Sequence, residues 1–197
     1  MNKIAGSISV NNLKVLIFIV VSFLTNIQKF RRILQLCIRI MKIRLLLIGK
    51  TEEEFLKTGI QEYVMRVRRY VTFDIVEIPA LKNAANLSAA EQNARESALL
   101  IKQFSPGDVI VLLDEHGKEM RSTEFAAFLN RQFLTSSKNL VFVVGGPYGF
   151  DPSVRKLASS MLSLSQMTFS HQMIRLFFTE QLYRALTIIR GESYHHE

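Results

Sequence analysis

Residues 41–197 are predicted to form a single α/β domain with a mainly parallel sheet flanked by helices. Strand-like and helix-like segments alternate along this stretch with short connections, as they do in βαβ units. Residues 108–113 (DVIVLL) and 139–144 (NLVFVV) are continuous apolar runs, as expected for strands that are covered on both faces. We therefore expect these two segments to be central strands of the sheet.

The remaining elements follow from periodicity, turn residues and capping residues. Thr51 with Glu54, and Ser88 with Glu91, have the spacing of capping boxes, and each pair predicts the start of a helix. Pro79 ends one of the strands. The expected strands lie at residues 42–48, 72–78 and 161–164, and the expected helices at 51–69, 88–104, 122–134, from 152 onward, and at 171–190.

The helix expected at residues 122–134 carries a phenylalanine-rich stripe. Its apolar residues recur at helical spacing, which is typical of a helix with one face turned to a core. They are Phe125, Phe128, Leu129 and Phe133. Periodicity favours a core-facing stripe over an aromatic binding platform.

Residues 1–40 differ in composition from the rest of the chain. They hold six basic residues and no acidic one, so the formal charge of +8 leaves 19 basic against 17 acidic residues beyond position 40. The apolar run at residues 15–24 is about half the roughly 20 residues of a membrane-spanning helix, and no small-residue cleavage site follows it. We interpret this leader as disordered, or as upstream sequence read from a misassigned start before Met41. A membrane anchor is the alternative.

Composition also bears on the kind of site to expect. Cys37 is the single cysteine, and no cluster of Cys and His has metal-ligand spacing, so neither a disulfide nor a metal is expected and a cytoplasmic location fits best. The sequence has no GxxxxGK[ST] motif for a nucleoside triphosphate. Because residues 41–197 are nearly neutral, affinity for RNA would have to come from a local basic patch.

Three loops that follow predicted strands are the expected ligand site, because ligands of open α/β sheets bind outside the carboxyl ends of the strands. The loops are residues 113–118 (LDEHGK), 145–150 (GGPYGF) and 165–171 (SQMTFSH). Glycines such as Gly145 and Gly146 let a ligand approach the backbone closely, although a simple tight turn is the commoner reason for such a pair.

Several polar side chains near these loops are candidate acid–base groups. Asp114, Glu115 and His116 lie together, but three polar residues in a loop more often form a solvated turn. His171 lies at the start of the last predicted helix, close to the expected site, and capping or packing there is the simpler alternative to a role in the site. Residues 194–197 (YHHE) follow a long apolar helix, so they either fray in solvent or dock onto the protein.

Five motifs, in this order, resemble the ribosomal RNA large subunit methyltransferase H family of the SPOUT superfamily. They are VLLDEHGK at 111–118, FVVGGPYGF at 142–150, SLSQMTFSHQMIR at 163–175, EQLYRA at 180–185 and the closing YHHE. The resemblance covers residues 41–197. It implies a SPOUT fold with a C-terminal trefoil knot, which the general rule against threaded chains would not suggest.

The resemblance also implies an activity. Members use S-adenosyl-L-methionine to methylate N3 of a pseudouridine in 23S ribosomal RNA, within the 50S subunit or the 70S ribosome, and they act as homodimers. Carried over position by position, the cofactor contacts fall on the three loops. They are Leu113, Gly145, Gly146, Ser165, Gln166, Met167, Thr168, Phe169 and Ser170. The family often has proline at position 170.

The C-terminal residues and a set of arginines complete the implied site. Tyr194 and His195 match the family, and we take them as catalytic candidates, with His195 as the base or orienting group. The family commonly has arginine where this chain has His196, and an imidazole can be neutral at pH 7. A basic patch assembled across the dimer is expected to bind RNA through Arg68, Arg69, Arg155, Arg175, Arg184 and His196, with Arg66 and Lys156 nearby.

Two other functions are compatible with parts of the sequence. The βα alternation by itself permits a flavodoxin-like module that binds a nucleotide or a flavin. The leader permits a non-catalytic protein tethered to a membrane. Calorimetry with flavin and membrane fractionation, respectively, would detect them. Neither alternative accounts for the ordered set of five motifs.

Overall fold

The computed structural model describes residue 29 and residues 41–135 and 139–194. The predicted leader therefore lies outside the described residues apart from Lys29, and so do His195 and His196. The division of the chain near residue 40 stays a prediction. Among the described residues, no helix has the length and apolarity that a membrane span requires.

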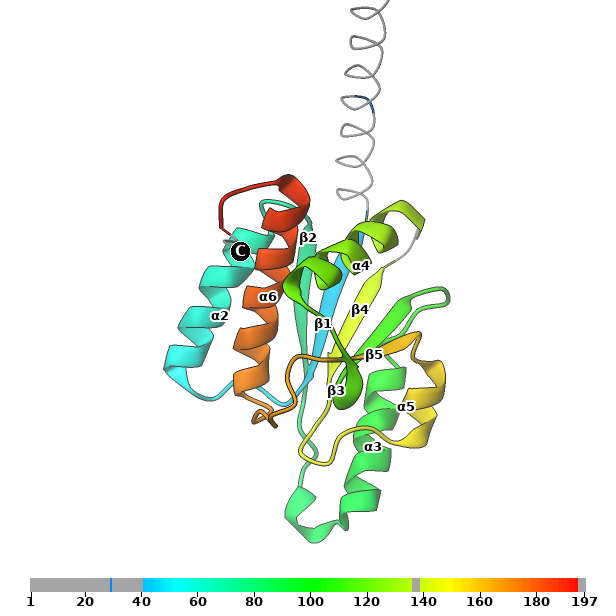
Figure 1. The fold of residues 1–197 in the computed structure, drawn as a ribbon. Helices are drawn as coiled ribbons and strands as arrows, with labels where there is room; N and C mark the ends of the chain where they lie inside the picture. The colour runs from blue at the N-terminus through cyan, green and yellow to red at the C-terminus, as the bar shows by residue number, and fades with distance from the viewer. Residues whose placement is uncertain (1–28, 30–40, 136–138, 195–197) are drawn as a thin grey trace, which may run out of the picture. The chain divides into compact units, whose positions relative to one another are not determined.

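Five strands form one sheet in which every neighbouring pair is parallel, in the order β2-β1-β4-β3-β5 (Figure 1). The strands are β1 (Lys42–Ile48), β2 (Thr72–Ile78), β3 (Val109–Glu119), β4 (Leu140–Val144) and β5 (Ser160–Ser163). β4 is central and buried along its whole length, and β3 lies beside it. The prediction that the two apolar runs are internal strands is confirmed.

Helices cover both faces of the sheet (Figure 1). On one face α2 (Glu54–Val67) and α4 (Ser122–Thr135) each pack against α6 (Met173–Arg190). On the other face α3 (Ala89–Ile101) contacts α5 (Pro152–Leu157). A short 3₁₀ helix, η1 (Ala84–Asn86), lies between β2 and α3.

The central strand β4 contributes to both layers of the core, because successive side chains of a strand point to opposite faces. Val141 and Val143 join the apolar cluster under α3 and α5. The ring of Phe142 faces the other way and lies 6.1 Å from Phe125 of α4 and 4.6 Å from Phe178 of α6, between ring centroids. The predicted apolar stripe of α4 is buried at Phe125, Phe128, Leu129 and Phe133.

One of the two predicted capping boxes is confirmed and the other is wrong. Ser88 Oγ accepts from the backbone N–H of Glu91 at 3.3 Å, and the Glu91 carboxylate accepts from the backbone N–H of Ser88 at 2.9 Å. The N-cap of α2 is Glu53 and its side chain makes no capping bond. Thr51 is instead buried, and its backbone N–H donates to Glu77 Oε1 at 3.1 Å.

β3 continues past Leu113, where we expected it to end. Leu113 and Lys118 both pair with Leu162 of β5, so residues 114–117 loop out between them. Gly117 makes this possible, because a Cβ there would lie 2.6 Å from the backbone of Leu162. The bulge carries the polar residues of the predicted DEHG loop to the end of the sheet.

Arg175, on the first turn of α6, is fully buried and joins that helix to the end of β1. Its guanidinium donates to the carbonyl oxygens of Ile48 at 2.7 Å, Gly49 at 3.2 Å and His171 at 2.9 Å, and to Thr51 Oγ1 at 3.0 Å. A side chain enclosed in this way is not available to grip phosphate. The structure therefore corrects its assignment to the RNA-binding patch and gives it a structural role.

Replacing Arg175 with Met is expected to lower the free energy of unfolding by roughly 3 to 5 kcal/mol, because buried carbonyl acceptors lose a charged donor. Urea denaturation followed by circular dichroism measures the change. As a control, Arg69→Met alters an exposed arginine on the same layer and should stay within about 0.5 kcal/mol of the unsubstituted protein. Equal effects of the two substitutions would contradict the structural role.

Candidate functional site

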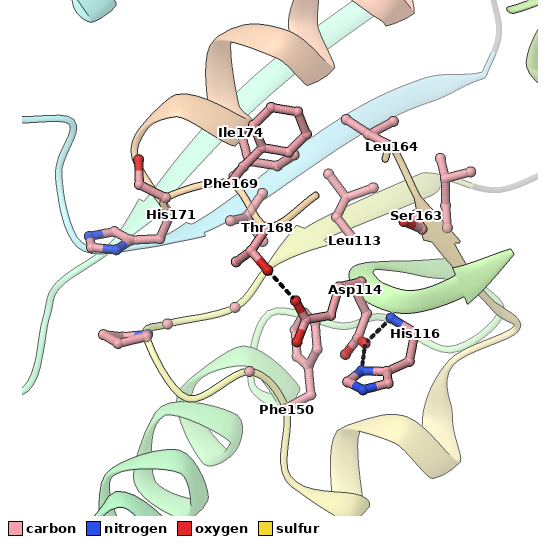
Figure 2. Close-up of a pocket in the computed structure, with 18 of the residues that line it drawn as sticks. Leu113, Asp114, His116, Phe150, Ser163, Leu164, Thr168, Phe169, His171 and Ile174 are labelled. Atoms are coloured by element: carbon pink, nitrogen blue, oxygen red, sulfur yellow. Dashed lines mark hydrogen bonds and ion pairs between the residues drawn. The ribbon is translucent and has the colours of Figure 1, made fainter. Parts of the chain in front are cut away.

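A cavity of about 530 Å³ opens at the carboxyl ends of β3, β4 and β5 (Figure 2). Its volume lies in the range of roughly 300 to 1,000 Å³ that is usual for small-molecule sites. All three loops that were predicted from their positions after strands contribute to its lining. The bulge of β3 and the loops that follow β4 and β5 thus converge on one ligand-sized space.

Eight of the nine predicted cofactor-binding residues line this cavity. They are Leu113, Gly145, Gly146, Ser165, Met167, Thr168, Phe169 and Ser170. The ninth, Gln166, is not among the lining residues, and its Nε2 donates to Glu119 Oε2 at 3.3 Å. The predicted loop segment therefore faces the cavity with most of its residues, while Gln166 joins the segment to β3.

The cavity combines an apolar wall with a polar rim. Phe169 is fixed against Phe177 of α6, with 4.8 Å between the ring centroids. The apolar lining residues include Leu113, Val144, Phe150, Leu162, Leu164, Phe169 and Ile174. Such a wall suits a flat aromatic ring, whereas the carboxylates, hydroxyls and backbone groups at the rim suit polar parts of the same ligand.

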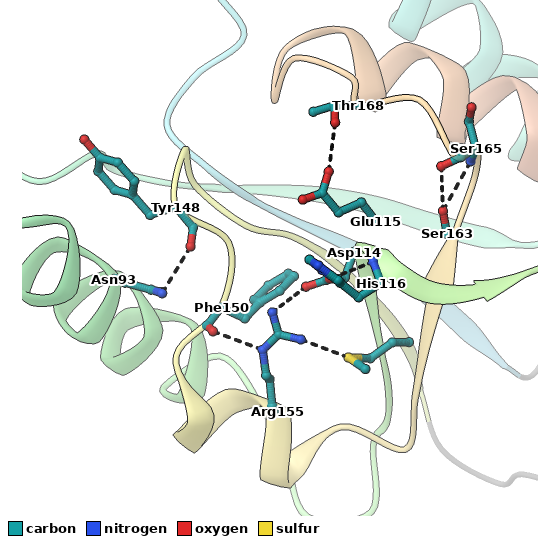
Figure 3. A network of polar contacts seen from close by, with 11 residues as sticks. Asn93, Asp114, Glu115, His116, Tyr148, Phe150, Arg155, Ser163, Ser165 and Thr168 are labelled. Atoms are coloured by element: carbon teal, nitrogen blue, oxygen red, sulfur yellow. Dashed lines mark hydrogen bonds and ion pairs between the residues drawn. The ribbon is translucent and has the colours of Figure 1, made fainter.

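The glycine turn after β4 requires its glycines. Gly149 has a φ of +74°, a region that side-chain-bearing residues rarely adopt, and its N–H donates to the carbonyl oxygen of Gly146 at 3.1 Å. A Cβ on Gly145 would lie 2.9 Å from the Gly149 oxygen. Asn93 of α3 donates to the carbonyl oxygen of Tyr148 at 3.2 Å (Figure 3). The turn is thus stabilised by its own backbone hydrogen bond and by a hydrogen bond from α3.

Glu96 of α3 lies directly behind Gly146 and was missed by sequence reasoning. Its side chain is buried, with 4% of the residue exposed, and Oε1 accepts from Gln92 Nε2 at 2.8 Å. Oε2 is buried and has no hydrogen-bond partner among the described residues. Burial raises the pKa of this carboxyl, while the Gln92 hydrogen bond and His171 act in the opposite direction. A glutamate in the middle of a helix gives no local signal of this environment.

A polar network fixes the bulge of β3 at the rim of the cavity (Figure 3). Asp114 Oδ2 accepts from Arg155 Nη2 at 2.8 Å, and Oδ1 lies 3.0 Å from His116 Nδ1. Arg155 also donates through Nε to the Phe150 carbonyl oxygen at 3.2 Å and contacts Met161 Sδ at 3.3 Å. Of the predicted RNA-binding arginines, Arg155 lines the cavity. Its guanidinium is engaged by Asp114.

One hydrogen bond connects two of the loops across the rim. Thr168 Oγ1 donates to Glu115 Oε2 at 2.8 Å, which links the segment before α6 to the bulge of β3 (Figure 3). Both side chains belong to exposed residues that line the cavity. The three acidic and imidazole side chains predicted as acid–base candidates, Asp114, Glu115 and His116, are therefore all at the cavity.

Three other predicted RNA-binding arginines do not line the cavity. Arg68 donates through Nε to the carbonyl oxygen of Phe73 at 3.0 Å, and Arg69 is exposed at the end of α2. Arg184 of α6 pairs with Glu180 at 2.6 Å.

Tyr194 is fixed between α2 and α6 and does not line the cavity. Its hydroxyl donates to Glu180 Oε1 at 3.1 Å and lies 3.4 Å from the hydroxyl of Tyr63. The Tyr183 ring meets it edge-on at 4.7 Å, and Arg184 lies 4.8 Å from its centroid. Burial is the largest cause of the raised pKa of Tyr194. The last described residue of the tail is thus docked on the helices.

A model of the family described as predicted SPOUT methyltransferase matches residues 41–195. The chain therefore belongs to the SPOUT methyltransferases. This membership confirms the predicted fold class and favours a methyltransferase over the flavodoxin-like alternative. The trefoil knot stays a prediction.

Relatives narrow the family further. A protein of Bacteroides thetaiotaomicron named ribosomal RNA large subunit methyltransferase H is 55% identical over 157 residues, which are 80% of this chain and 100% of that protein. A protein of the same name from Porphyromonas gingivalis is 48% identical with the same coverage. Within the SPOUT methyltransferases, the chain belongs to the ribosomal RNA large subunit methyltransferase H family.

Among solved structures, a probable methyltransferase from Bordetella pertussis Tohama I is similar to this chain. The two are 10% identical and superpose with a TM-score of 0.47. The match covers 78% of this chain and 98% of that one.

Substituting Gly146 with Ala is expected to destabilise the protein by roughly 1 to 3 kcal/mol, because the added Cβ would lie 2.1 Å from Glu96 Oε2. All three nearest atoms belong to Glu96, so a second substitution, Glu96→Ala, should recover at least about 1 kcal/mol of coupling. Chemical denaturation of the single and double variants measures both effects.

Gly149→Ala is the matched control for this prediction. Its Cβ would meet nothing within 4 Å, but its φ of +74° strains any side-chain-bearing residue. Glu96→Ala should therefore leave the destabilisation of Gly149→Ala unchanged. Recovery in both backgrounds would show that Glu96 does not occupy the space next to Gly146.

Proposed function

We propose that this chain is a cytoplasmic, S-adenosyl-L-methionine-dependent methyltransferase that methylates N3 of a pseudouridine in 23S ribosomal RNA, within the 50S subunit or the 70S ribosome. Family membership supports methyl transfer, and the relatives' name supports large-subunit ribosomal RNA as the substrate. The observation that carries the proposal is the cavity at the strand ends, lined by eight of the nine residues expected to hold the cofactor.

The residues of the cavity fit the chemistry of S-adenosyl-L-methionine. Gly146 leaves the backbone open to a ligand, and the apolar wall around Leu113, Leu162 and Ile174 would hold the adenine ring. The Glu96 carboxyl lies behind Gly146, next to the cavity, where its ionised form would supply negative charge. When bound, the cofactor supplies a methyl group on a positively charged sulfur.

Two tasks then fall to the chain's own residues. They hold N3 of the target base in line with the methyl group, and they accept the proton that N3 loses when it is methylated. Positioning of this kind supplies most of the acceleration in our proposal, and a proton acceptor contributes typically about 10²- to 10⁴-fold. His195 is our first candidate for the acceptor, and it lies outside the described residues.

The His116 imidazole is the second candidate for the same task. It lines the cavity, and its Nδ1 is fixed 3.0 Å from Asp114 Oδ1, an arrangement in which a carboxylate orients a base. The Asp114 carboxylate is itself held by Arg155. Substituting each of the two histidines therefore shows which one accepts the proton.

If His195 accepts the proton, His195→Ala should reduce single-turnover methylation by about 10²- to 10⁴-fold, with cofactor affinity changed little. Quenched methyl-transfer assays and titration calorimetry measure the two quantities. His116→Ala serves as the comparison and should retain most of the rate. The reverse pattern would assign the proton to His116.

A homodimer is part of the proposal. Tyr194 and Arg184 are fixed on the α2–α6 side and do not line the cavity of their own chain, so a second subunit would have to bring such residues to it. Phe177 of α6 is 40% exposed and Met167 at the cavity rim is 77% exposed, as side chains covered in a dimer would be. A monomeric mass in solution would contradict this part.

Arg68 and Arg69 are proposed to contact RNA phosphates, and the double variant Arg68→Glu, Arg69→Glu tests them. The slope of log affinity against log salt concentration should become shallower by about 2, because each phosphate contact releases about one counterion. Filter binding of ribosomal RNA at several salt concentrations gives this slope. As a charge control, Arg131→Glu on α4 should leave it unchanged, and an unchanged slope in both proteins removes the two arginines from the interface.

Mass analysis of ribosomal RNA from a strain lacking this gene tests the function as a whole. We expect one pseudouridine in 23S ribosomal RNA to lose a single methyl group, and reintroducing residues 41–197 to restore it. Unaltered RNA in the deletion strain would reject the proposed reaction.

A further inference from the structure

The Glu96 carboxyl is the buried polar group whose environment calls for an explanation. Only 4% of the residue is exposed, and Oε2 has no hydrogen-bond partner among the described residues. A buried carboxylate oxygen without a partner is destabilising, so native structures contain few of them. Gln92 Nε2 donates a hydrogen bond to the other carboxyl oxygen, Oε1, at 2.8 Å, so Oε1 has a partner and Oε2 does not.

The unpartnered oxygen lies directly behind the glycine turn that lines the cavity, although Glu96 itself is not a lining residue. Oε2 would lie 2.1 Å from a Cβ on Gly146, so it occupies the place that a side chain would take on the cavity-lining turn. Three elements face the carboxyl: α3 contributes the neutral amide of Gln92, the turn after β4 contributes Gly146, and the segment before α6 contributes His171. His171 is the ionisable group that acts on Glu96, and it also lines the cavity.

We propose that Glu96 is a positioning residue for the methyl donor, and that its carboxylate, acting across Gly146, favours a ligand with a positively charged sulfur over one with a neutral sulfur. The inference rests on the proposed function, because it assumes that S-adenosyl-L-methionine occupies the cavity. Charges interact more strongly in a buried environment than in water. The donor carries a positive sulfur and the product, S-adenosyl-L-homocysteine, does not, so Glu96 helps the site to hold the donor and release the product.

A purely structural role makes a different prediction. If Glu96 only packs α3 against the turn, its loss weakens donor and product equally, because the two ligands share every group except the transferred methyl and the charge on sulfur. The ratio of the two dissociation constants, product over donor, therefore isolates the effect of charge from the effect of packing.

Titration calorimetry of both ligands with the full chain measures this ratio. Glu96→Gln keeps the size of the side chain and removes its charge, so the ratio should fall by about five- to tenfold, mainly through weaker donor binding. Glu96→Asp keeps the charge and should retain most of the ratio. Glu62→Gln removes an exposed carboxylate on α2 and should change neither constant.

A second variant tests the inference even if the Glu96→Gln protein does not fold. Gln92→Leu removes the hydrogen bond to Oε1, which favours the neutral form of the carboxyl, so it should lower the ratio in the same direction. Equal weakening of both ligands in Glu96→Gln and Gln92→Leu, or no change in either, overturns the inference. If the unsubstituted protein binds neither ligand, the proposed function fails, and the inference fails with it.

Discussion

The guanidinium of Arg175 is the contact on which the geometry of the cavity most depends. It reaches from the first turn of α6 to the carbonyl oxygens at the end of β1, and it also holds the carbonyl oxygen of His171. The segment between β5 and α6 is therefore anchored at the end that joins α6. Three carbonyl oxygens and the Thr51 hydroxyl accept hydrogen bonds from the guanidinium, and the nearby carboxylates of Glu77 and Glu52 favour its charged form.

A second constraint acts from the opposite layer of the sheet. α3 supports the glycine turn twice, through the Asn93 hydrogen bond to Tyr148 and through the Glu96 side chain that fills the space beside Gly146. The two layers of helices thus hold different walls of one cavity. The apolar sheet between them is buried on both faces, which leaves the loops at its end as the place where polar groups can gather.

Strand positions, the buried stripe of α4 and the Ser88 capping box could be predicted from the sequence, because each depends on local periodicity or on residues three apart. The convergence of three loops also followed, since parallel strands place their carboxyl ends at one edge. Contacts between residues that are distant in the chain have no local sequence pattern from which they could be predicted. Thr51 forms hydrogen bonds with Glu77 and Arg175 and does not cap α2. Arg175 is buried, although arginines usually lie at the surface.

The bulge of β3 and the environment of Glu96 could not be predicted from the sequence for the same reason. The bulge depends on pairing with β5, and the environment of Glu96 depends on the glycine turn. Recognition of the family depended on the order of short motifs, and the roles proposed for Tyr194 and His195 rest on that resemblance.

The hydrogen bond between Thr168 and Glu115 has a consequence for how a ligand enters. It joins two exposed side chains, so its net contribution to stability is only about 0.5 to 1.5 kcal/mol. The loops on either side are anchored independently, one by Arg175 and the other by Arg155. Separating these two side chains would therefore break one weak hydrogen bond and would leave the contacts of Arg175 and Arg155 intact.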